Sequence, residues 1–314
     1  AASDVYKRQA DIYIVNTCSV TNMAERKSRQ MLHRAKKKNP DVVVVAVGCY
    51  AQVGKEELSK DTNIDLIIGN NKKKDLIHIL EEHMGEKESA TESIEVIDIA
   101  HDQEYESLHV EQLKEHTRAY IKVQDGCNQF CSYCIIPYAR GRVRSRKMEE
   151  VLEEITNLTK HGCQEFVITG IHVTSYGKDL GDVTLIDLLE EIAKIPEVKR
   201  IRLGSLEPGF ITKDTLDRLS KMESFCPHFH LSLQSGCDSV LKRMNRKYTT
   251  QDIREKCKAI REHFQYPALT TDIIVGFPGE TEEEFEETRK FLEEIDLYEM
   301  HVFKYSIRKG TKAA

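Results

Sequence analysis

The stretch RAYIKVQDGCNQFCSYC, residues 118–134, joins an apolar strand to a loop with three cysteines. Residues 120–124 alternate in the manner of a buried strand, so the loop begins where that strand ends. Cys127, Cys131 and Cys134 follow with C-x3-C-x2-C spacing, which places three thiols within eight residues. Because the loop is too short for the thiols to face apart, we expect them to bind one metal centre.

The kind of metal follows from the number of ligands. A structural zinc site takes four protein ligands, and no fourth cysteine or histidine pair lies near this loop. A 4Fe–4S cluster on three cysteines instead leaves one iron open to an exogenous ligand. We therefore expect a 4Fe–4S cluster, with a zinc loop that borrows a distant cysteine as the alternative.

The alternation of strands and helices continues to the end of the chain. Apolar runs typical of strands occur at residues 165–169, 200–203, 230–233, 271–275 and 302–305, with amphipathic helical segments between them. Six such strands predict a partial (βα)6 barrel over residues 116–314. The active site of a βα barrel lies at the carboxyl ends of its strands.

A second unit precedes the barrel. Residues 11–15, 42–47 and 66–68 are short apolar runs that alternate with helical segments at 25–38 and 73–83. This pattern predicts a small parallel α/β, Rossmann-like domain over residues 10–85. Residues 86–115 are acidic and lack clear periodicity, so we expect a linker with one short strand near 94–99.

Two further cysteines end the strands of the first domain. Cys18 follows the first apolar run and Cys49 follows the second. The carboxyl edge of a parallel sheet is where α/β folds bind ligands. A buried cysteine is often only a small apolar filler, but two at equivalent strand ends are better explained as metal ligands.

The composition favours a cytoplasmic, monomeric protein. The chain of 314 residues has a net charge of −6, no long apolar run and no secretory signal, so its nine cysteines are expected as reduced thiols or metal ligands. Basic residues cluster at 26–38, 140–147 and 242–247 beside the candidate sites. This distribution of basic residues predicts a polyanionic partner. The lack of a long apolar run predicts that the chain does not span a membrane.

The cysteine loop after the first strand of a six-stranded barrel resembles the radical S-adenosylmethionine (SAM) superfamily. The resemblance implies that SAM binds the open iron and is cleaved to a deoxyadenosyl radical, which makes Cys127, Cys131 and Cys134 catalytic. It also implies a SAM cavity at the strand ends, with Tyr133 beside the adenine and Gly170 at the methionine amine. The other implied SAM-binding residues are Ser232, Gln234 and Arg246.

The first domain adds a narrower resemblance. Asn16-Thr17-Cys18 and Gly48-Cys49-Tyr50-Ala51-Gln52, ahead of the radical SAM loop, are similar to the methylthiotransferases. That family holds a second, auxiliary 4Fe–4S cluster on three cysteines, and Cys18 and Cys49 match the second and third. The first would lie upstream of residue 1. The spare thiols that could replace it are Cys163, Cys226 and Cys237.

Three segments resemble the branch that acts on threonylcarbamoyl-adenosine of tRNA: NTCSVT at 16–21, PYARGR at 137–142 and SLEP at 205–208. The resemblance implies that a methylthio group replaces hydrogen on carbon 2 of the adenine beside the anticodon. One SAM would methylate a sulfur on the auxiliary cluster, and a second would supply the radical. The alternatives are isopentenyl-adenosine of tRNA, a ribosomal protein aspartate, or a truncated, inactive iron–sulfur or zinc module.

The resemblance also implies partners. The target base lies in a single-stranded anticodon loop, which can be presented to a pocket without melting a duplex. An electron donor such as flavodoxin or ferredoxin would reduce the cluster. A small β-barrel RNA-binding domain would follow residue 314. Alternating arginines past the cluster loop are expected to contact tRNA phosphates, with solvation of an edge strand as their other role: Arg140, Arg142, Arg144 and Arg146.

Overall fold

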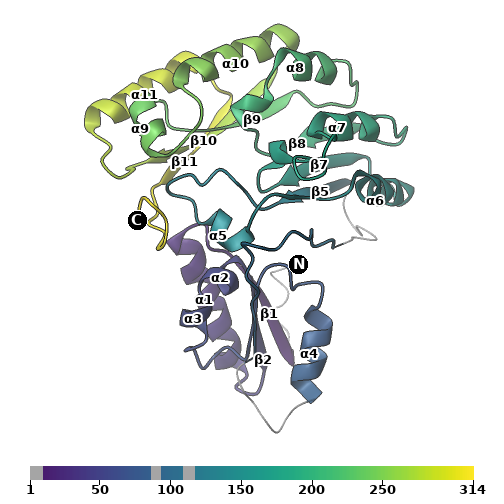
Figure 1. Cartoon of the computed structure of the whole chain (residues 1–314), viewed down its shortest axis with the longest axis vertical. Helices are drawn as coiled ribbons and strands as arrows, with labels where there is room; N and C mark the ends of the chain where they lie inside the picture. The colour runs from purple at the N-terminus through teal and green to yellow at the C-terminus, as the bar shows by residue number, and fades with distance from the viewer. Residues whose placement is uncertain (1–9, 86–92, 109–116) are drawn as a thin grey trace.

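The computed structural model describes residues 10–85, 93–108 and 117–314, which form two domains stacked end to end (Figure 1). The lower, N-terminal domain contains four parallel strands in the order β1-β2-β3-β4. Helices α1, α2 and α3 lie on one side of this sheet and α4 lies on the other (Figure 1). The element bounds are β1 Ile12–Thr17, α1 Asn22–Lys38, β2 Val43–Gly48, α2 Cys49–Val53, α3 Lys55–Leu58, β3 Leu66–Ile68, α4 Leu76–Gly85 and β4 Ser93–Glu95.

Strand β2 shows why this domain is layered. Val44 and Ala46 pack in one buried cluster with residues of α1, while Val45 and Val47 pack in another with residues of α4. Side chains of a strand alternate between faces, so a strand that is apolar at every position needs cover on both. The expected parallel α/β domain is confirmed.

The sheet extends farther along the chain than the sequence indicates. Strand β4 pairs in parallel with β3 through Ile67 and Ile94, so part of the expected linker belongs to the first domain. In the rest of the linker, residues 96–108 are described, whereas 86–92 and 109–115 lie outside the described residues.

The upper domain is the expected partial barrel of six parallel strands, covered on its outer side by helices (Figure 1). The order is β5-β7-β8 and then β9-β10-β11, and two isolated parallel bridges join the halves at β8 and β9. The strand bounds are β5 Arg118–Asp125, β6 Arg144–Ser145 (a short antiparallel partner of β5), β7 Glu165–Gly170, β8 Arg200–Leu203, β9 His228–Gln234, β10 Ala268–Val275 and β11 Glu299–Lys304.

Four helices of this domain, α7, α8, α10 and α11, begin at threonine caps that the sequence supplies. Thr184, Thr212, Thr249 and Thr281 each cap a helix with a reciprocal hydrogen bond to the third helical residue, which fixes where the chain leaves each strand-end loop. The helix bounds are α5 Ile136–Arg140, α6 Met148–Lys160, α7 Leu185–Ala193, α8 Lys213–Leu219, α9 Asp238–Arg243, α10 Thr250–His263 and α11 Glu282–Ile295, with short 3₁₀ turns at Val173–Ser175 and Pro208–Phe210.

The end of the chain returns to the first domain. Arg308 donates to Asn22 Oδ1 at 2.6 Å and forms an ion pair with Glu25, both at the start of α1. Ser306 Oγ accepts from the Asn22 amide at 3.1 Å. The Arg308 side chain is 7% exposed and that of Glu25 is 13% exposed, so this pair is shielded from water. No described helix is long and apolar enough to cross a membrane.

The Arg308 pair predicts a measurable stability difference. Arg308→Met leaves the Glu25 carboxylate buried without its cation, which costs roughly 3 kcal/mol. We expect a clearly lower midpoint of thermal unfolding by circular dichroism. Arg289→Met, which removes an exposed ion pair with Glu286 and Glu293 on α11, is the matched control and should leave the midpoint unchanged. Equal midpoints for both variants would contradict the assignment.

Candidate cluster and cofactor site

The three-cysteine loop runs from the end of β5 to the start of α5, and one glycine sets its path. Gly126 has φ +72, and a Cβ added there would lie 1.7 Å from the Arg142 carbonyl oxygen. The backbone after α5 packs directly against the loop, and the Cys127 amide donates to the Gly141 carbonyl at 3.0 Å. Only glycine permits both the conformation and the approach.

The far side of the loop is attached to the segment that follows α9. The Ser132 amide donates to the Met244 carbonyl at 3.0 Å, and its hydroxyl donates to the Arg243 carbonyl at 2.8 Å. Asn245 Nδ2 donates to the Phe130 carbonyl at 3.0 Å. The loop is therefore held from two separate segments, the one that follows α5 and the one that follows α9, which pre-organises its thiols.

The chemistry of the three thiols fits an iron–sulfur cluster. Among the described residues, no group of three His, Cys, Asp or Glu is placed to hold one metal ion. A 4Fe–4S cluster takes its thiolates on different irons, so its ligands stand farther apart. Burial raises the pKa of Cys127, and burial with the nearby Cys131 and Cys127 raises that of Cys134 to about 12. These residues fit a cluster whose iron stabilises the thiolate form.

Arg246 lies directly against this loop. Its Nη1 donates to Cys131 Sγ at 3.0 Å, and its Nη2 donates to Glu207 Oε1 at 2.7 Å and to the Ser232 carbonyl at 2.8 Å. Nε donates to Tyr248 Oη at 2.7 Å. The Arg246 side chain is only 6% exposed. A buried cation is thus fixed beside the Cys131 sulfur.

Glu207 belongs to the SLEP segment, and the structure gives it a place in the site. Besides Arg246, its Oε1 lies 3.7 Å from His172 Nε2. Burial alone would raise the pKa of Glu207, but the bond from His172 and the charge of Arg246 hold it below its usual value. Glu207 is therefore an anion at neutral pH, facing the same loop as the cluster cysteines.

Gly170 ends β7 beside a glutamine that sequence reasoning missed. A Cβ at Gly170 would meet the Gln124 side chain at 2.8 Å. Gln124 is fully buried, accepts from the His172 amide at 2.7 Å and donates to the Gly126 carbonyl at 2.7 Å. It thereby links the loop after β7 to the cysteine loop. The sequence did carry a signal for Gln124, because it is a polar residue at the end of an otherwise apolar strand.

The remaining expected SAM residues lie on the other side of the barrel mouth. Tyr133 packs edge-on against Phe277 with ring centroids 6.4 Å apart, in an apolar cluster that includes Met244. Gln234 ends β9 with φ +72, an unusual conformation for a residue with a side chain. Tyr133 follows β5, Gly170 ends β7, and Ser232 and Gln234 lie on β9, so these residues are placed on or after the carboxyl ends of three barrel strands. None of the five residues expected around SAM lines the cavity described next.

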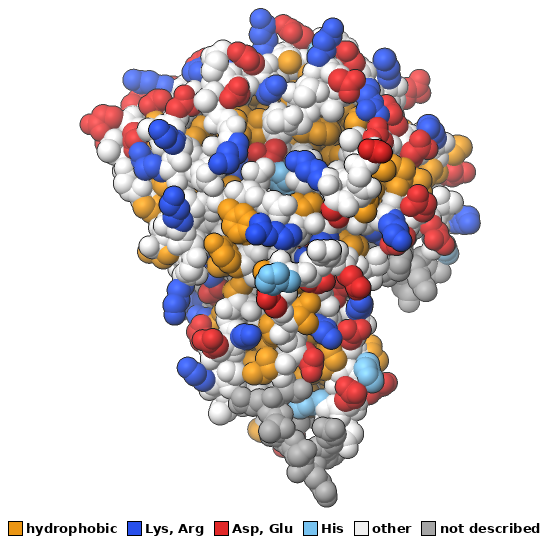
Figure 2. All heavy atoms as spheres, in the orientation of Figure 1, with side chains coloured by type: hydrophobic (Ala, Val, Ile, Leu, Met, Phe, Trp, Pro, Cys, Tyr) orange, Lys and Arg blue, Asp and Glu red, His pale blue; other side chains and the backbone are white. Residues whose placement is uncertain are grey.

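A cavity of about 730 Å³ opens at these strand ends. It is lined on its inner side by Gln129, His172, Glu207 and Tyr248, and it extends outward past Lys247 toward α7 and α8. Its volume suits a nucleotide-sized ligand. The face seen in Figure 2 carries acidic and basic side chains intermixed.

Cys18 and Cys49 lie side by side in the first domain. Thr17 and Gly48 are register partners on β1 and β2, so the two cysteines leave adjacent strands at the same level. Gly48 has φ +97, and a Cβ there would lie 2.5 Å from Asn16 Oδ1. Cys18 is exposed and Cys49 is buried. The expected pair of thiols at one sheet edge is present.

Cys49 is held by the barrel domain. Arg140 Nε donates to Cys49 Sγ at 3.1 Å, and Arg140 Nη1 donates to Asp125 Oδ2 at 3.2 Å. Asn70 Nδ2 lies 3.7 Å from the same sulfur and donates to the Ala139 carbonyl at 2.7 Å. Helix α5, which follows the three-cysteine loop, therefore packs on the cysteine of the other site.

The spare thiols do not join this pair. Cys163 donates to the Thr117 carbonyl at 3.3 Å at the start of β7, and Cys226 precedes β9, so both lie at the opposite ends of the barrel strands. Cys237 is buried and lies 3.2 Å from Glu287 of α11. None of the three is placed as a replacement ligand for the auxiliary site.

The four alternating arginines, all expected to contact tRNA phosphates, have different environments. Arg144 is buried and donates to the Arg140 carbonyl at 2.9 Å. Arg146 is buried and paired with Glu154. Arg140 binds Cys49 and Asp125, as described above. Arg142 is exposed and is the member of the four open to an RNA backbone.

A six-stranded parallel barrel with a three-cysteine loop after its first strand defines the radical SAM class. Residues 121–292 match the model of the radical SAM superfamily, and residues 2–69 match that of an uncharacterized protein family, UPF0004. Radical SAM proteins work with a 4Fe–4S cluster and SAM, and a 4Fe–4S cluster is present in a solved structure similar to this chain.

Similar proteins place the chain within one family of radical SAM proteins. The chain is 41% identical to the threonylcarbamoyladenosine tRNA methylthiotransferase MtaB of Bacillus subtilis, over 98% of this chain and 68% of that protein. It is 42% identical to MtaB of Aquifex aeolicus, over 98% and 74%. It is also 41% identical to the tRNA-2-methylthio-N(6)-dimethylallyladenosine synthase of Dictyoglomus thermophilum, over 98% and 69%. The chain belongs to the radical SAM tRNA methylthiotransferase family.

The fold comparison agrees. The radical SAM methyltransferase TsrM of Kitasatospora setae superposes with a TM-score of 0.68 at 16% identity, covering 96% of this chain and 63% of that one. At this identity the similarity shows the two-domain fold alone. It confirms the predicted α/β domain followed by a radical SAM barrel.

The tight backbone contact at Gly126 predicts that a larger residue there prevents cluster binding. Gly126→Ala places a methyl group against the Arg142 carbonyl, so the loop must move and its thiols must separate. We expect iron and acid-labile sulfide bound after anaerobic reconstitution to fall by more than half. Gly85→Ala is the control, because nothing lies within 4 Å of a Cβ there. Unchanged iron in Gly126→Ala would contradict this role.

The raised thiol pKa values predict slow alkylation of the metal-free chain. A raised pKa keeps Cys134 protonated at neutral pH, and only the thiolate reacts with iodoacetamide. Between pH 7 and pH 9 we expect Cys134 to react at least tenfold more slowly than the exposed Cys18, by mass spectrometry of the derived peptides. Equal rates at pH 8 would show that Cys134 is not held as a buried thiol.

Proposed function

We propose that this chain is a tRNA-modifying enzyme that adds a methylthio group to carbon 2 of threonylcarbamoyl-adenosine next to the anticodon. The observation that carries the proposal is identity of about 40% to tRNA methylthiotransferases over nearly the whole chain. The fold is consistent with it, because α2, which begins at Cys49, packs on α5, which begins two residues after Cys134. SAM and the iron–sulfur clusters supply the radical and the methylthio group when bound.

The residues of this chain have distinct proposed roles. Cys127, Cys131 and Cys134 hold the cluster that binds SAM, and Cys18 and Cys49 are two ligands of the auxiliary cluster. Arg246 keeps negative charge near Cys131 and, through its bond to the Ser232 carbonyl, fixes the end of β9. The SAM contacts are proposed at Tyr133, Gly170, Ser232, Gln234 and Arg246.

Glu207 supports the threonylcarbamoyl branch. It lies in the SLEP segment, which resembles that branch, and it lines the cavity while pairing with Arg246. A segment that differs between branches therefore borders the space where a substrate base would meet SAM. The identity to the dimethylallyladenosine synthase of Dictyoglomus thermophilum favours isopentenyl-adenosine as the second candidate substrate.

This chemistry also indicates the substrate, the electron donor and the cellular location that we propose. The substrate is the anticodon loop of tRNA, and Arg142 is offered as a phosphate contact. A small electron-transfer protein such as flavodoxin or ferredoxin supplies the reducing electron. The protein acts as a monomer in the cytoplasm, where tRNA and reduced thiols coexist.

The radical SAM assignment predicts a cysteine-dependent cleavage. After anaerobic reconstitution and reduction, the chain should convert SAM to 5′-deoxyadenosine, and Cys131→Ala should abolish this conversion because one cluster ligand is lost. Cys226→Ala, a half-buried thiol remote from the loop, is the matched control and should retain it. Cleavage that persists in Cys131→Ala, or that fails in wild type with a bound cluster, would overturn the assignment.

The substrate is decided by supplying three tRNA preparations in parallel: one with threonylcarbamoyl-adenosine, one with isopentenyl-adenosine and one unmodified. Nucleosides are digested and identified by liquid chromatography and mass spectrometry. We expect a mass gain of one methylthio group in the first alone. A gain in the second alone would select the other candidate.

A further inference from the structure

The half-buried Phe130 and the exposed Tyr138 and Arg142 form a cluster at the junction of the two domains. Phe130 and Tyr138 stack edge to face with ring centroids 5.9 Å apart. The Arg142 guanidinium lies over the Phe130 ring, 4.7 Å from its centroid. Tyr138 is 50% exposed, although Pro137 and Ala139 on either side are buried. We call these three residues the aromatic platform.

The backbone of the aromatic platform is fixed. Phe130 has φ +49, which is strained for an aromatic residue, and its carbonyl accepts from Asn245 Nδ2. The Arg142 carbonyl lies against Gly126, as described for the cysteine loop. A ring held in this way loses little conformational freedom on binding a ligand, which favours stacking.

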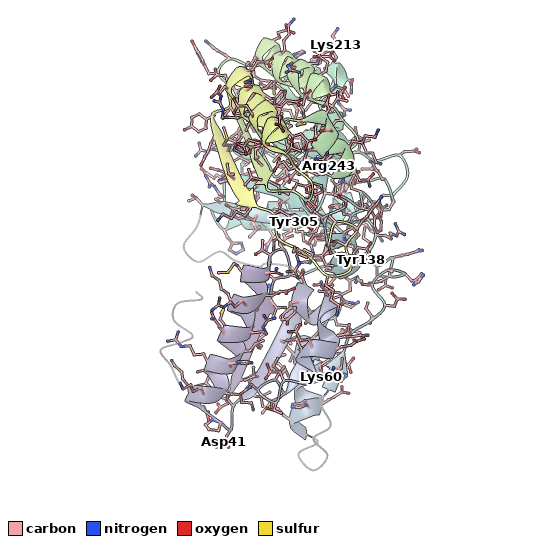
Figure 3. The ribbon with its side chains drawn as sticks, turned by 90° about the vertical axis from the view of Figure 1, so that its left-hand side faces the viewer. Asp41, Lys60, Tyr138, Lys213, Arg243 and Tyr305 are labelled. Carbon is pink, nitrogen blue, oxygen red and sulfur yellow. The ribbon has the colours of Figure 1, made fainter. Side chains whose placement is uncertain are left out.

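The aromatic platform borders a groove of about 620 Å³ between the domains. The N-terminal domain supplies Gln52, Lys55 and residues 96–100 to its other wall. Two cations, Lys55 and Arg142, face one anion, Asp98, whose carboxylate is already bound to His101. Tyr138 can be seen where the two domains meet (Figure 3). Aromatic faces and net positive charge are the features that bind single-stranded RNA.

The groove also lies next to both groups of cysteines. Phe130 directly precedes Cys131, and Tyr138 lies on α5, which begins two residues after Cys134. Gln52 lies on α2, which begins at Cys49. A base bound here would therefore lie against the segments that carry both groups of cysteines.

We infer that the aromatic platform stacks an unpaired base of the anticodon loop next to the modified adenine, while Arg142 contacts the adjoining phosphate. The inference rests on the proposed tRNA function and adds the surface that positions the loop. Stacking on an aromatic ring tolerates any base, so the platform orients the loop and leaves identification of the modified base to the cavity at the strand ends.

The test uses a short anticodon stem-loop RNA with 2-aminopurine beside the target adenine. Stacking quenches this fluorophore, so titration with the wild-type chain should lower its emission. Tyr138→Leu should reduce the quenching and weaken binding roughly 5- to 150-fold, the range for loss of one stacked base. Arg142→Gln should flatten the dependence of log affinity on log salt by about 0.7, the value for one phosphate contact on a single strand.

Tyr266→Leu is the matched control, since Tyr266 is 90% exposed and precedes β10 at the other end of the barrel. It should bind RNA like wild type. Circular dichroism establishes that each variant is folded.

The possible results distinguish failure of the proposed tRNA function from failure of the role assigned to the aromatic platform. If wild type does not bind the stem-loop, the proposed tRNA function fails. If wild type binds and Tyr138→Leu behaves like Tyr266→Leu, the tRNA function stands and the aromatic platform is overturned. Weaker docking of flavodoxin or ferredoxin to Tyr138→Leu, with RNA binding intact, would assign the surface to an electron donor and also overturn the inference.

Discussion

A buried charge network between the domains holds the two cysteine sites together. Asp125 is 2% exposed at the end of β5. Burial alone would raise its pKa, but Lys122 and Arg140 lower it below the usual value, so the carboxylate is charged. Arg140 in turn reaches Cys49 in the other domain. A buried anion requires its cations, so the barrel, helix α5 and the auxiliary site cannot separate without cost.

The parallel arrangement of the strands explains why a few residues suffice to build the candidate sites. Strands β1 and β2 point their carboxyl ends at the junction, and β5, β7 and β9 open at the barrel mouth. Each cysteine, glycine or glutamate that follows a strand is thereby delivered to a shared region. The rest of the sequence mainly builds the layers that keep these ends in place.

The alternating arginines show where reasoning from sequence reaches its limit. Arg140, Arg142, Arg144 and Arg146 have the same chemistry and even spacing, and from sequence they look equivalent. In the fold, Arg144 and Arg146 are buried, Arg140 bridges the domains, and Arg142 alone of the four is exposed. The short strand expected near 94–99 is present as β4, but its place beside β3 in the first sheet was not predicted, because three residues carry too little pattern to assign a partner.

The sequence by itself determined the two α/β units, the cysteine loop and the residues at the strand ends. These depend on local periodicity, on spacing and on glycines such as Gly126, which act over a few residues. The tertiary structure decided that Glu207 pairs with Arg246 and that Arg140 reaches Cys49. The paired residues are separated by dozens of positions along the chain. Packing alone brings them together, since burial forces each charge to find a partner that the linear order does not reveal.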